Sequence, residues 1–328
     1  MIPPEPIPPP AGWQMAGQAR IPVVPPYRLD LTATVLRRIA LNPVDVLAAD
    51  GRYMRAFAGP GGAWVVAATQ AAGADALDVA VYGPARQPPD AAAVADLAAT
   101  LRRTLGTQID LAGFYAAARA VPRLYPLVVQ AEGVKPPRYP TLWEAICNTV
   151  VFQQVSIDAA MASMRRFITH YSVPVAFGET VLYLFPTPEA TLGADPAALR
   201  AQGLSGAKVR TLQNLANELL AGTLTAAELD ALPTPAAMAR LTGLRGIGPW
   251  TAAVIMLRGF GRLDAFPAGD SGARRSMAGL LGVAEAERGV DGAAILAALG
   301  PWRGMLYYHL LLWRLQQRGL LTPAPGGP

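Results

Sequence analysis

One glycine-rich segment has the residue types needed to hold a phosphate. In residues 241–253, LTGLRGIGPWTAA, Gly246 and Gly248 flank Ile247 between two stretches of helical spacing. Glycine accepts positive φ and carries no side chain, so backbone N–H groups in such a turn can approach an anion while Ile247 packs between the helices. Pro249 suits the first position of the second helix, whose N-terminus adds free N–H groups and partial positive charge. The pattern predicts a phosphate-binding turn.

A carboxylate follows this turn at a defined distance. Asp270 lies in residues 264–270, DAFPAGD, 20 positions after Trp250. Aspartate also suits the N-cap of a helix that begins near Ser271. The capping role and a chemical role are compatible, and both are kept as expectations.

The elements that must position these residues can be read from the surrounding pattern. A helix with Thr234 as N-cap and Pro235 in its first turn is expected to lead into the turn, which gives a helix-hairpin-helix over residues 235–259. From residue 112 onward the apolar spacing is almost entirely helical, with proline and glycine between the helices.

The chain is expected to divide into three parts. Residues 1–24 predict a proline-rich, extended tail, residues 25–111 a mixed α/β domain, and residues 112–328 a helical core. A helical run over 91–105 is expected to pack on the sheet of the α/β domain. The β-like runs of that sheet are Tyr53 to Phe57, Trp64 to Ala68 and Leu77 to Tyr82.

Composition limits the class of protein. The formal net charge is +5 and the isoelectric point about 9.5, which is compatible with a polyanionic partner. No run approaches the roughly 18 apolar residues that cross a bilayer, and the first residues lack the features of a secretory signal. The single cysteine, Cys147, excludes a disulfide framework and a four-thiolate cluster, and it is expected in the core. Two isolated histidines are too few for a zinc site.

The glycine turn followed by Asp270 resembles the helix-hairpin-helix DNA repair glycosylases. With the PPY opening of the α/β domain, the chain resembles the 3-methyladenine DNA glycosylase II type over about residues 22–322, most densely in 140–167 and 241–313. The resemblance implies a mainly helical fold. An N-terminal mixed α/β domain would precede a two-lobed helix-hairpin-helix glycosylase core, with the active cleft between the lobes and Asp270 as the catalytic carboxylate.

A second block is YPTLWEAICNTVVFQQVSIDAAMASMRRF, residues 139–167. Apolar residues at helical spacing predict an amphipathic helix, which the polar cluster Gln153, Gln154 and Ser156 interrupts. The resemblance implies that this point faces DNA, with Gln154 as the wedge that enters the space left by an extruded nucleotide. A polar helix junction that satisfies its own backbone is the alternative.

Lysine is scarce. Only Lys135 and Lys208 are lysines among the 28 basic residues, and neither lies near the hairpin. Relatives that nick the strand through a Schiff base have a lysine where this chain has Trp250, and tryptophan cannot act as an amine nucleophile. The resemblance therefore implies a monofunctional enzyme. Lys208 lies in a Gly-Leu-Ser-x-x-Lys helix start, where either phosphate contact or capping and packing is expected.

The third block, PWRGMLYYHLLLWRLQQ at residues 301–317, predicts a helix with an aromatic face. The resemblance implies that this helix closes the base pocket, with Leu311 at the position of a tryptophan in relatives. Trp313 points to another face of a helix and is expected in the core. Trp250, Tyr307 and Tyr308 are therefore the candidates for the aromatic wall.

These expectations combine into one hypothesis and two alternatives. The hypothesis is a monomeric, cytoplasmic, nucleoid-associated glycosylase that flips cationic alkylated purines out of double-stranded DNA and hydrolyses the N-glycosidic bond. Gly246, Ile247, Gly248, Gln153, Gln154, Ser156 and Lys208 would contact DNA. No cofactor is expected beyond a monovalent cation that the hairpin could hold. An oxidised-purine (8-oxoguanine-type) glycosylase and a non-catalytic helix-hairpin-helix DNA-binding protein are the alternatives.

Overall fold

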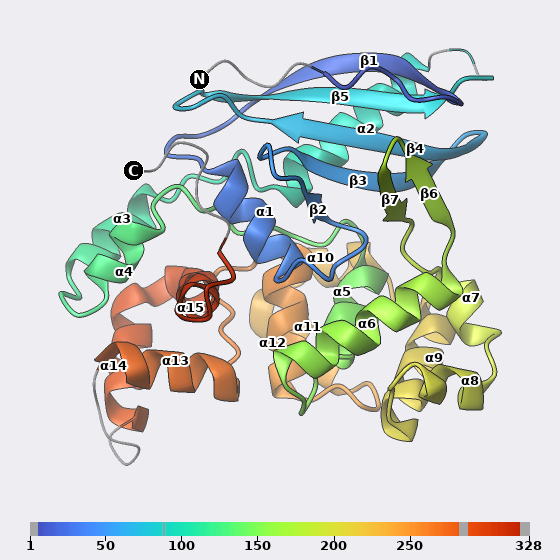
Figure 1. Cartoon of the computed structure of the whole chain (residues 1–328). Coiled ribbons are helices and arrows are strands. Elements are labelled where there is room, and N and C mark those ends of the chain that lie inside the picture. Colours follow the sequence, from blue (N-terminus) through green and yellow to red (C-terminus); the bar gives the residue numbers. More distant parts are fainter. Residues whose placement is uncertain (1–5, 87, 89, 282–287, 322–328) are drawn as a thin grey trace.

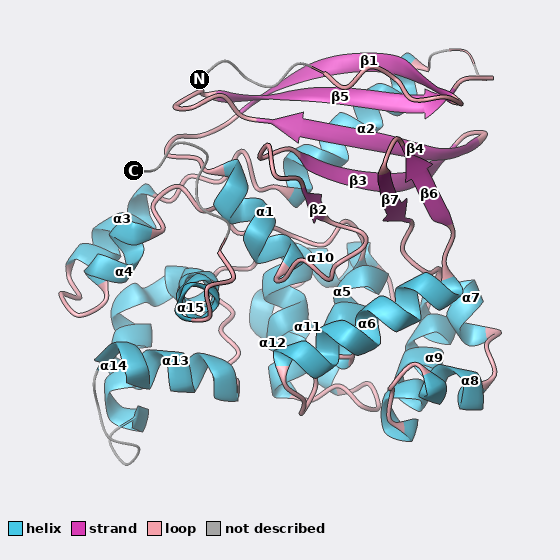
Figure 2. Cartoon of the chain, in the orientation of Figure 1, coloured by secondary structure: helices cyan, strands magenta, loops and turns pink. Residues whose placement is uncertain are grey.

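The N-terminal part of the chain forms a five-stranded antiparallel sheet in the order β1-β5-β4-β3-β2 (Figures 1 and 2). The computed structural model describes residues 6–86, 88, 90–281 and 288–321. The strands are β1 (Trp13–Pro22), β2 (Val46–Leu47), β3 (Tyr53–Gly59), β4 (Gly62–Thr69) and β5 (Ala76–Pro84). The three β-like runs of the sequence are thereby confirmed as β3, β4 and β5.

Strand β1 corrects the expectation of an extended tail over residues 1–24. It pairs with β5 from Trp13 opposite Pro84 to Pro22 opposite Ala76, with an irregularity between Met15 and Gly17. Most of its residues are only partly buried because it is an edge strand, so the alternation of apolar and polar residues is weak. The prolines of the first ten residues precede the strand and do not interrupt it.

The two faces of the sheet carry separate cores. Helices α1 (Leu29–Arg37) and α2 (Ala91–Thr104) cover one face, which confirms the expected packing of the second helix. The other face is covered by β6 (Pro174–Phe177) and β7 (Thr180–Tyr183), a hairpin inserted in a region expected to be helical. Phe177 packs edge-on against Tyr82 of β5, with ring centroids 4.8 Å apart. One pair of four-residue runs separated by two residues carries too little sequence signal to distinguish a hairpin from a loop.

The rest of the described chain is helical and shares one large apolar core. Its elements are α3 (Ala112–Arg119), α4 (Tyr125–Gln130), α5 (Leu142–Val150), α6 (Ile157–Tyr171), α7 (Pro188–Leu192), α8 (Pro196–Ala201), α9 (Gly206–Leu220), α10 (Ala226–Ala231), α11 (Thr234–Thr242), α12 (Pro249–Ile255), the π-helix η1 (Met256–Phe260), α13 (Ser271–Leu281), α14 (Arg288–Leu299), the 3₁₀ helix η3 (Gly300–Trp302) and α15 (Arg303–Gln317). Figure 1 shows α5 to α12 gathered on one side and α3, α4 and α13 to α15 on the other, which is the expected two-lobed arrangement. Cys147 is buried in α5, as expected.

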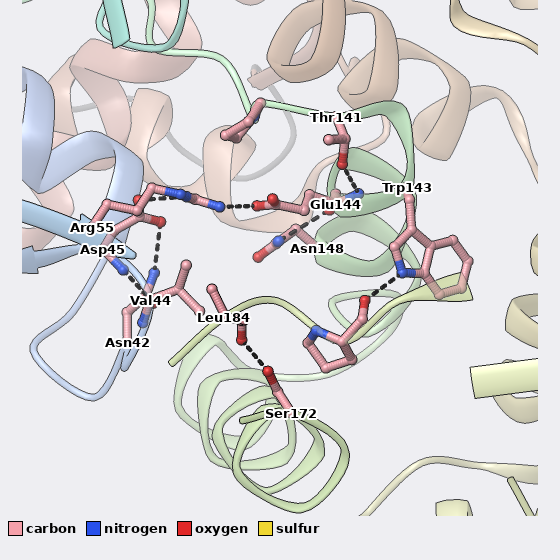
Figure 3. A network of polar contacts seen from close by, with 12 residues as sticks. Asn42, Val44, Asp45, Arg55, Thr141, Trp143, Glu144, Asn148, Ser172 and Leu184 are labelled. Carbon is pink, nitrogen blue, oxygen red and sulfur yellow. Dashed lines mark hydrogen bonds and ion pairs between the residues drawn. The ribbon is translucent and has the colours of Figure 1, made fainter. Parts of the chain in front are cut away.

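A buried ionic network connects the sheet to α5 (Figure 3). Arg55 of β3 donates to Asp45 at 2.7 Å and to Glu144 of α5 at 2.5 Å. Burial by itself would lower the pKa of Arg55, but the two carboxylates raise it well above its usual value. Because loss of Arg55 would leave two buried carboxylates unpaired, this network fixes the α/β domain on the helical core.

Candidate active site

An open groove of about 1320 Å³ lies where the two helical lobes meet. The junction between α5 and α6, the turn between α11 and α12, the start of α13 and one face of α15 form its walls. The residues that sequence reasoning had singled out and that line it are Gln153, Gln154, Ser156, Gly246, Ile247, Gly248, Trp250, Asp270, Tyr307 and Leu311. Segments separated by more than 150 residues are thus brought to one surface.

Asp270 lies at the N-terminus of α13, half-buried in the wall of the groove. Its Oδ1 accepts a hydrogen bond from the backbone N–H of Ala273 at 2.7 Å, and its Oδ2 accepts one from Trp250 Nε1 at 3.1 Å. Asp270 therefore caps α13, as expected, and it also forms part of the groove wall. Its chemical role stays a prediction. Two donors from different elements hold the carboxylate in one orientation.

The turn between α11 and α12 combines one glycine of positive φ with one glycine whose surroundings are open. Gly246 has φ +90° and packs against Thr211, whose side chain would collide with an added Cβ. Gly248 has no atom within 4 Å of an added Cβ, so its backbone is open to a ligand in the groove. Ile247 is buried between the flanking helices. No side chain caps the start of α12, and its first residues line the groove, where a phosphate could reach their N–H groups.

The start of α11 differs from the expectation. Pro233 is the N-cap, Thr234 is the first helical residue, and no side chain caps the helix. The Thr234 hydroxyl instead donates to Asp264 Oδ1 at 3.0 Å. A tertiary partner thus replaces the local capping bond, because Asp264 from the segment after η1 lies beside this turn.

The polar cluster after α5 divides into three different functions. Gln153 Nε2 donates to the Gly246 carbonyl at 3.0 Å and to Thr251 Oγ1 at 2.9 Å, so it ties this junction to the hairpin. Gln154 is exposed and has φ +54°, an uncommon conformation for a residue with a side chain. Ser156 caps α6 through Ala159 N. Of these three side chains, only that of Gln154 has no hydrogen bond to the described part of the protein.

The aromatic face of α15 corrects one expectation. Tyr308 is fully buried and its hydroxyl donates to the Leu257 carbonyl at 3.2 Å, so Tyr308 does not reach the groove. Tyr307 and Leu311 line the groove. Burial, and next the charge of Asp270, raise the pKa of Tyr307. Trp313 packs against Gly279 of α13 and is outside the groove, in agreement with its expected core position.

Lys208 also lies outside the groove lining. Its Nζ donates to the Val151 carbonyl at the end of α5, at 2.9 Å. Burial lowers the pKa of this lysine. Of the two expectations, capping and packing describes this contact, because the ammonium satisfies a carbonyl that α5 itself leaves free.

Several groove residues were missed by sequence reasoning. Arg38, Phe152 and Arg314 all line the groove. Arg38 ends α1 with φ +65°, and its guanidinium lies 3.6 Å from the centroid of the Phe152 ring. The pair Arg37 and Arg38 after an apolar helix was visible in the sequence, but only the tertiary structure shows which of the two faces the groove.

Among the described residues, no group of three or more His, Cys, Asp or Glu side chains could hold a metal ion. No helix in the described ranges is long and apolar enough to cross a membrane. A monovalent cation in the hairpin would be held by backbone carbonyls, and one of these, Gly246 O, already accepts a hydrogen bond from Gln153.

Comparison with known families agrees with this geometry. Residues 18–141 match the AlkA N-terminal domain, and residues 147–291 match the model described as HhH-GPD superfamily base excision DNA repair protein. The chain thus contains an AlkA N-terminal domain followed by an HhH-GPD domain. The HhH-GPD match contains the hairpin, Trp250 and Asp270. The predicted domain boundary between residues 111 and 112 stays a prediction.

Curated relatives carry related names. The chain is 35% identical over 214 residues to the "Probable bifunctional transcriptional activator/DNA repair enzyme AlkA" of Mycobacterium tuberculosis, covering 65% of this chain and 41% of that protein. It is 27% identical over 207 residues to the "DNA-3-methyladenine glycosylase" of Bacillus subtilis, covering 63% and 67%. The chain therefore spans less than half of the M. tuberculosis protein.

Solved structures share the fold. A 3-methyladenine DNA-glycosylase from Archaeoglobus fulgidus has a TM-score of 0.74 at 24% identity, covering 91% of this chain and 99% of that one. An 8-oxoguanine glycosylase/lyase from Clostridium acetobutylicum in complex with double-stranded DNA has a TM-score of 0.65 at 15% identity, covering 89% and 93%. Because both kinds of enzyme share the fold, substrate class must be argued from side chains.

Proposed function

We propose that this chain is a monofunctional DNA glycosylase of base excision repair. It would extrude an alkylated purine from double-stranded DNA, hydrolyse the N-glycosidic bond and leave an abasic site. The observation that carries the proposal is the position of the Asp270 carboxylate in the groove wall, beside a hairpin whose Gly248 is open to a ligand. A pure DNA-binding protein gains nothing from an anion placed toward DNA.

The first steps are binding and extrusion. N–H groups of the hairpin and of the start of α12 would hold a phosphate of the damaged strand without reading sequence. The target nucleotide must leave the stack at a cost of about a few kcal/mol, and less where the damaged pair is poorly stacked. Gln154, exposed at the rim, would fill the vacated space and hydrogen-bond the orphaned opposite base.

The chemical step follows from the position of the carboxylate. When the C1′–N bond breaks, its electron pair leaves with the base and the sugar acquires oxocarbenium character. The Asp270 carboxylate would stabilise that positive charge and orient the water that forms the new C1′–O bond. A base alkylated at N3 or N7 carries a positive charge before departure and leaves as a neutral molecule. The faces of Trp250 and Tyr307 would attract such a cation by roughly 0.5 to 2 kcal/mol.

The contacts of the two lysines support hydrolysis without strand cleavage. A lyase reaction needs an amine that attacks C1′. Lys135 is buried and its Nζ donates to the Ile109 carbonyl at 2.8 Å, and Lys208 Nζ is bound to the Val151 carbonyl. Neither lysine lines the groove, and Trp250 lies against Asp270 where the bifunctional relatives carry their nucleophile.

A base-release assay tests the proposal. Duplexes with N7-methylguanine, 3-methyladenine or 8-oxoguanine would be incubated with the protein and analysed for free base, and for strand scission with and without later alkali. We expect release of the alkylated bases with scission only after alkali. Scission without alkali, or trapping by borohydride, would contradict the monofunctional assignment. Release of 8-oxoguanine alone would favour the oxidised-purine alternative, and binding without release the non-catalytic one.

Salt dependence tests the DNA contacts separately. We propose about three or four phosphate contacts by a monomer, which gives a slope near −3 for log affinity against log salt concentration. A slope near zero would argue against DNA as the partner.

The monovalent cation of the hairpin is likewise a proposal, tested by comparing affinity in potassium and in tetramethylammonium salts at equal ionic strength.

A further inference from the structure

Arg38 is a buried cation in the groove wall, and its Nη1 is buried without a hydrogen-bond partner. The residue is 5% exposed, and the described residues provide neither a hydrogen bond nor an ion pair for its guanidinium. The guanidinium stacks on the Phe152 ring, with Cζ 3.6 Å from the ring centroid. Because a buried guanidinium without partners costs free energy, a ligand that supplies acceptors would be favoured at this position.

The surroundings of Arg38 hold it in place. Arg258 donates from Nη2 to the carbonyls of Val35 and Leu36, at 2.9 and 3.3 Å, and so fixes the last turn of α1. The backbone N–H of Arg38 donates to Thr34 O, and its φ of +65° is uncommon for a residue with a side chain. A rigid terminus, rather than a flexible loop, therefore presents this guanidinium.

The same wall carries the catalytic carboxylate. Arg38, Tyr307 and Asp270 all line the groove. Burial has the largest effect on the pKa of Arg38 and lowers it, while the charge of Asp270 is among the effects that oppose the change. The guanidinium and the carboxylate therefore border the same groove.

We propose that Arg38 is a specificity-determining residue that reads the edge of the extruded base. This inference rests on the proposed glycosylase function. N–H groups of Arg38 donate hydrogen bonds to ring nitrogen or carbonyl acceptors of the base. They thereby raise release of neutral purines that carry a carbonyl, relative to cationic alkylated ones, above the ratio of a protein without this guanidinium.

The chemical reason lies in the charge of the leaving group. A neutral purine takes the electron pair of the C1′–N9 bond and departs with negative charge, which a donated guanidinium N–H stabilises until solvent protonates the ring. Water supplies the oxygen bound to C1′. A cationic purine departs neutral and gains less, while the positive charge of Arg38 opposes its entry.

The test compares two lesions in the same full-length protein. Single-turnover release of hypoxanthine and of N7-methylguanine from matched duplexes would be measured for the wild type, Arg38→Met and Arg38→Lys. Met keeps a long side chain on Phe152 without charge or donors, and Lys keeps the charge. Arg37→Met is the matched control, because Arg37 is also buried but does not line the groove.

We expect Arg38→Met to lower the ratio of hypoxanthine to N7-methylguanine release about tenfold or more, through loss of a charged hydrogen bond. Arg38→Lys should lower the ratio less than Arg38→Met, because the ammonium keeps the charge but loses the planar donor group that stacks on Phe152. Arg37→Met should keep the ratio within about threefold of wild type. Partial unfolding lowers both rates together and leaves the ratio unchanged. An unchanged ratio in Arg38→Met overturns the inference. So does a wild type that releases N7-methylguanine but no hypoxanthine, an outcome that leaves the proposed function standing, whereas release of neither base contradicts both.

Discussion

Trp250 Nε1 donates a hydrogen bond to Asp270 Oδ2 at 3.1 Å, across 20 residues of sequence. With Ala273 N bound to Oδ1 at 2.7 Å, each carboxylate oxygen has a fixed donor. The hairpin helix α12 and the cap of α13 therefore position one carboxylate together. In the proposed reaction, a developing positive charge would therefore meet an anion that does not need to reorient.

Asp270→Asn is expected to abolish base release while duplex binding survives. The amide keeps the size of the side chain and a carbonyl acceptor but cannot stabilise a cationic sugar. Single-turnover base release and a binding titration measure the two effects. Asp264→Asn is the control, since Asp264 is exposed and outside the groove lining. Retention of more than about a tenth of the activity would refute the catalytic assignment of Asp270.

Trp250→Phe is expected to slow base release about tenfold and to leave hairpin binding to DNA unchanged. The substitution keeps an aromatic face but removes the N–H that orients Asp270, and a hydrogen bond to a charged group contributes about 1.5 to 3 kcal/mol. Release rates at saturating enzyme and affinity for undamaged duplex separate the two effects. Equal loss of both would show that Trp250 supports only the fold of the hairpin.

Gly246→Ala and Gly248→Ala form a matched pair with different expected outcomes. At Gly246, φ +90° and the clash with Thr211 should cost about 1 to 3 kcal/mol of unfolding free energy. At Gly248 an added methyl group meets no protein atom, so stability should be unchanged. DNA affinity should nevertheless fall for Gly248→Ala, because the methyl group blocks approach to the backbone N–H groups. Urea unfolding and binding titrations check both. Unchanged DNA affinity in Gly248→Ala would contradict phosphate binding at this turn.

Gln154→Ala is expected to lower base release from well-paired lesions about tenfold, and less from mismatched ones. An alanine cannot fill the vacated space or bond the opposite base, and a mismatched nucleotide needs less help to leave the stack. The rates for one lesion opposite its partner and opposite a mismatch measure this difference. Gln153→Ala is not a neutral control, since Gln153 ties the junction to the hairpin. A uniform loss in both duplexes would argue that Gln154 is only a helix junction.

His309 should make stability depend on pH. Burial lowers the pKa of this imidazole from 6.5 to about 4. Between these values the unfolded chain binds a proton that the folded chain does not, so the stability is present above about pH 6.5 and is lost as the pH falls, by about 1.4 kcal/mol per unit. Urea unfolding of the wild type and of His309→Gln at pH 7 and pH 5 measures the difference. His170→Gln, at an exposed position, should retain the slope of the wild type.

Much of the site could be predicted because local rules place it. The glycine turn, the Asp270 cap and the buried Ile247 follow from φ preferences, free helix N–H groups and apolar spacing, all within about 30 residues of chain. The strands β3, β4 and β5 follow from β-branched and aromatic runs between turns. These patterns suffice because each depends on neighbours in sequence.

Other features required the folded chain. Tyr307 and Tyr308 are adjacent and chemically alike, yet one lines the groove and the other donates to Leu257 in the core, because the rotation of α15 is set by the elements packed around it. The end of α1 decides whether Arg37 or Arg38 enters the groove. Arg258, which lies more than 220 residues later in the chain, holds this end in place. Edge strand β1 and the β6–β7 hairpin owe their stability to the sheet they join.

The sequence by itself determined the family, the hairpin and the carboxylate, since these are written in local spacing. Only the tertiary structure decided which side chains share the groove, because that choice depends on packing between segments that are distant in the chain.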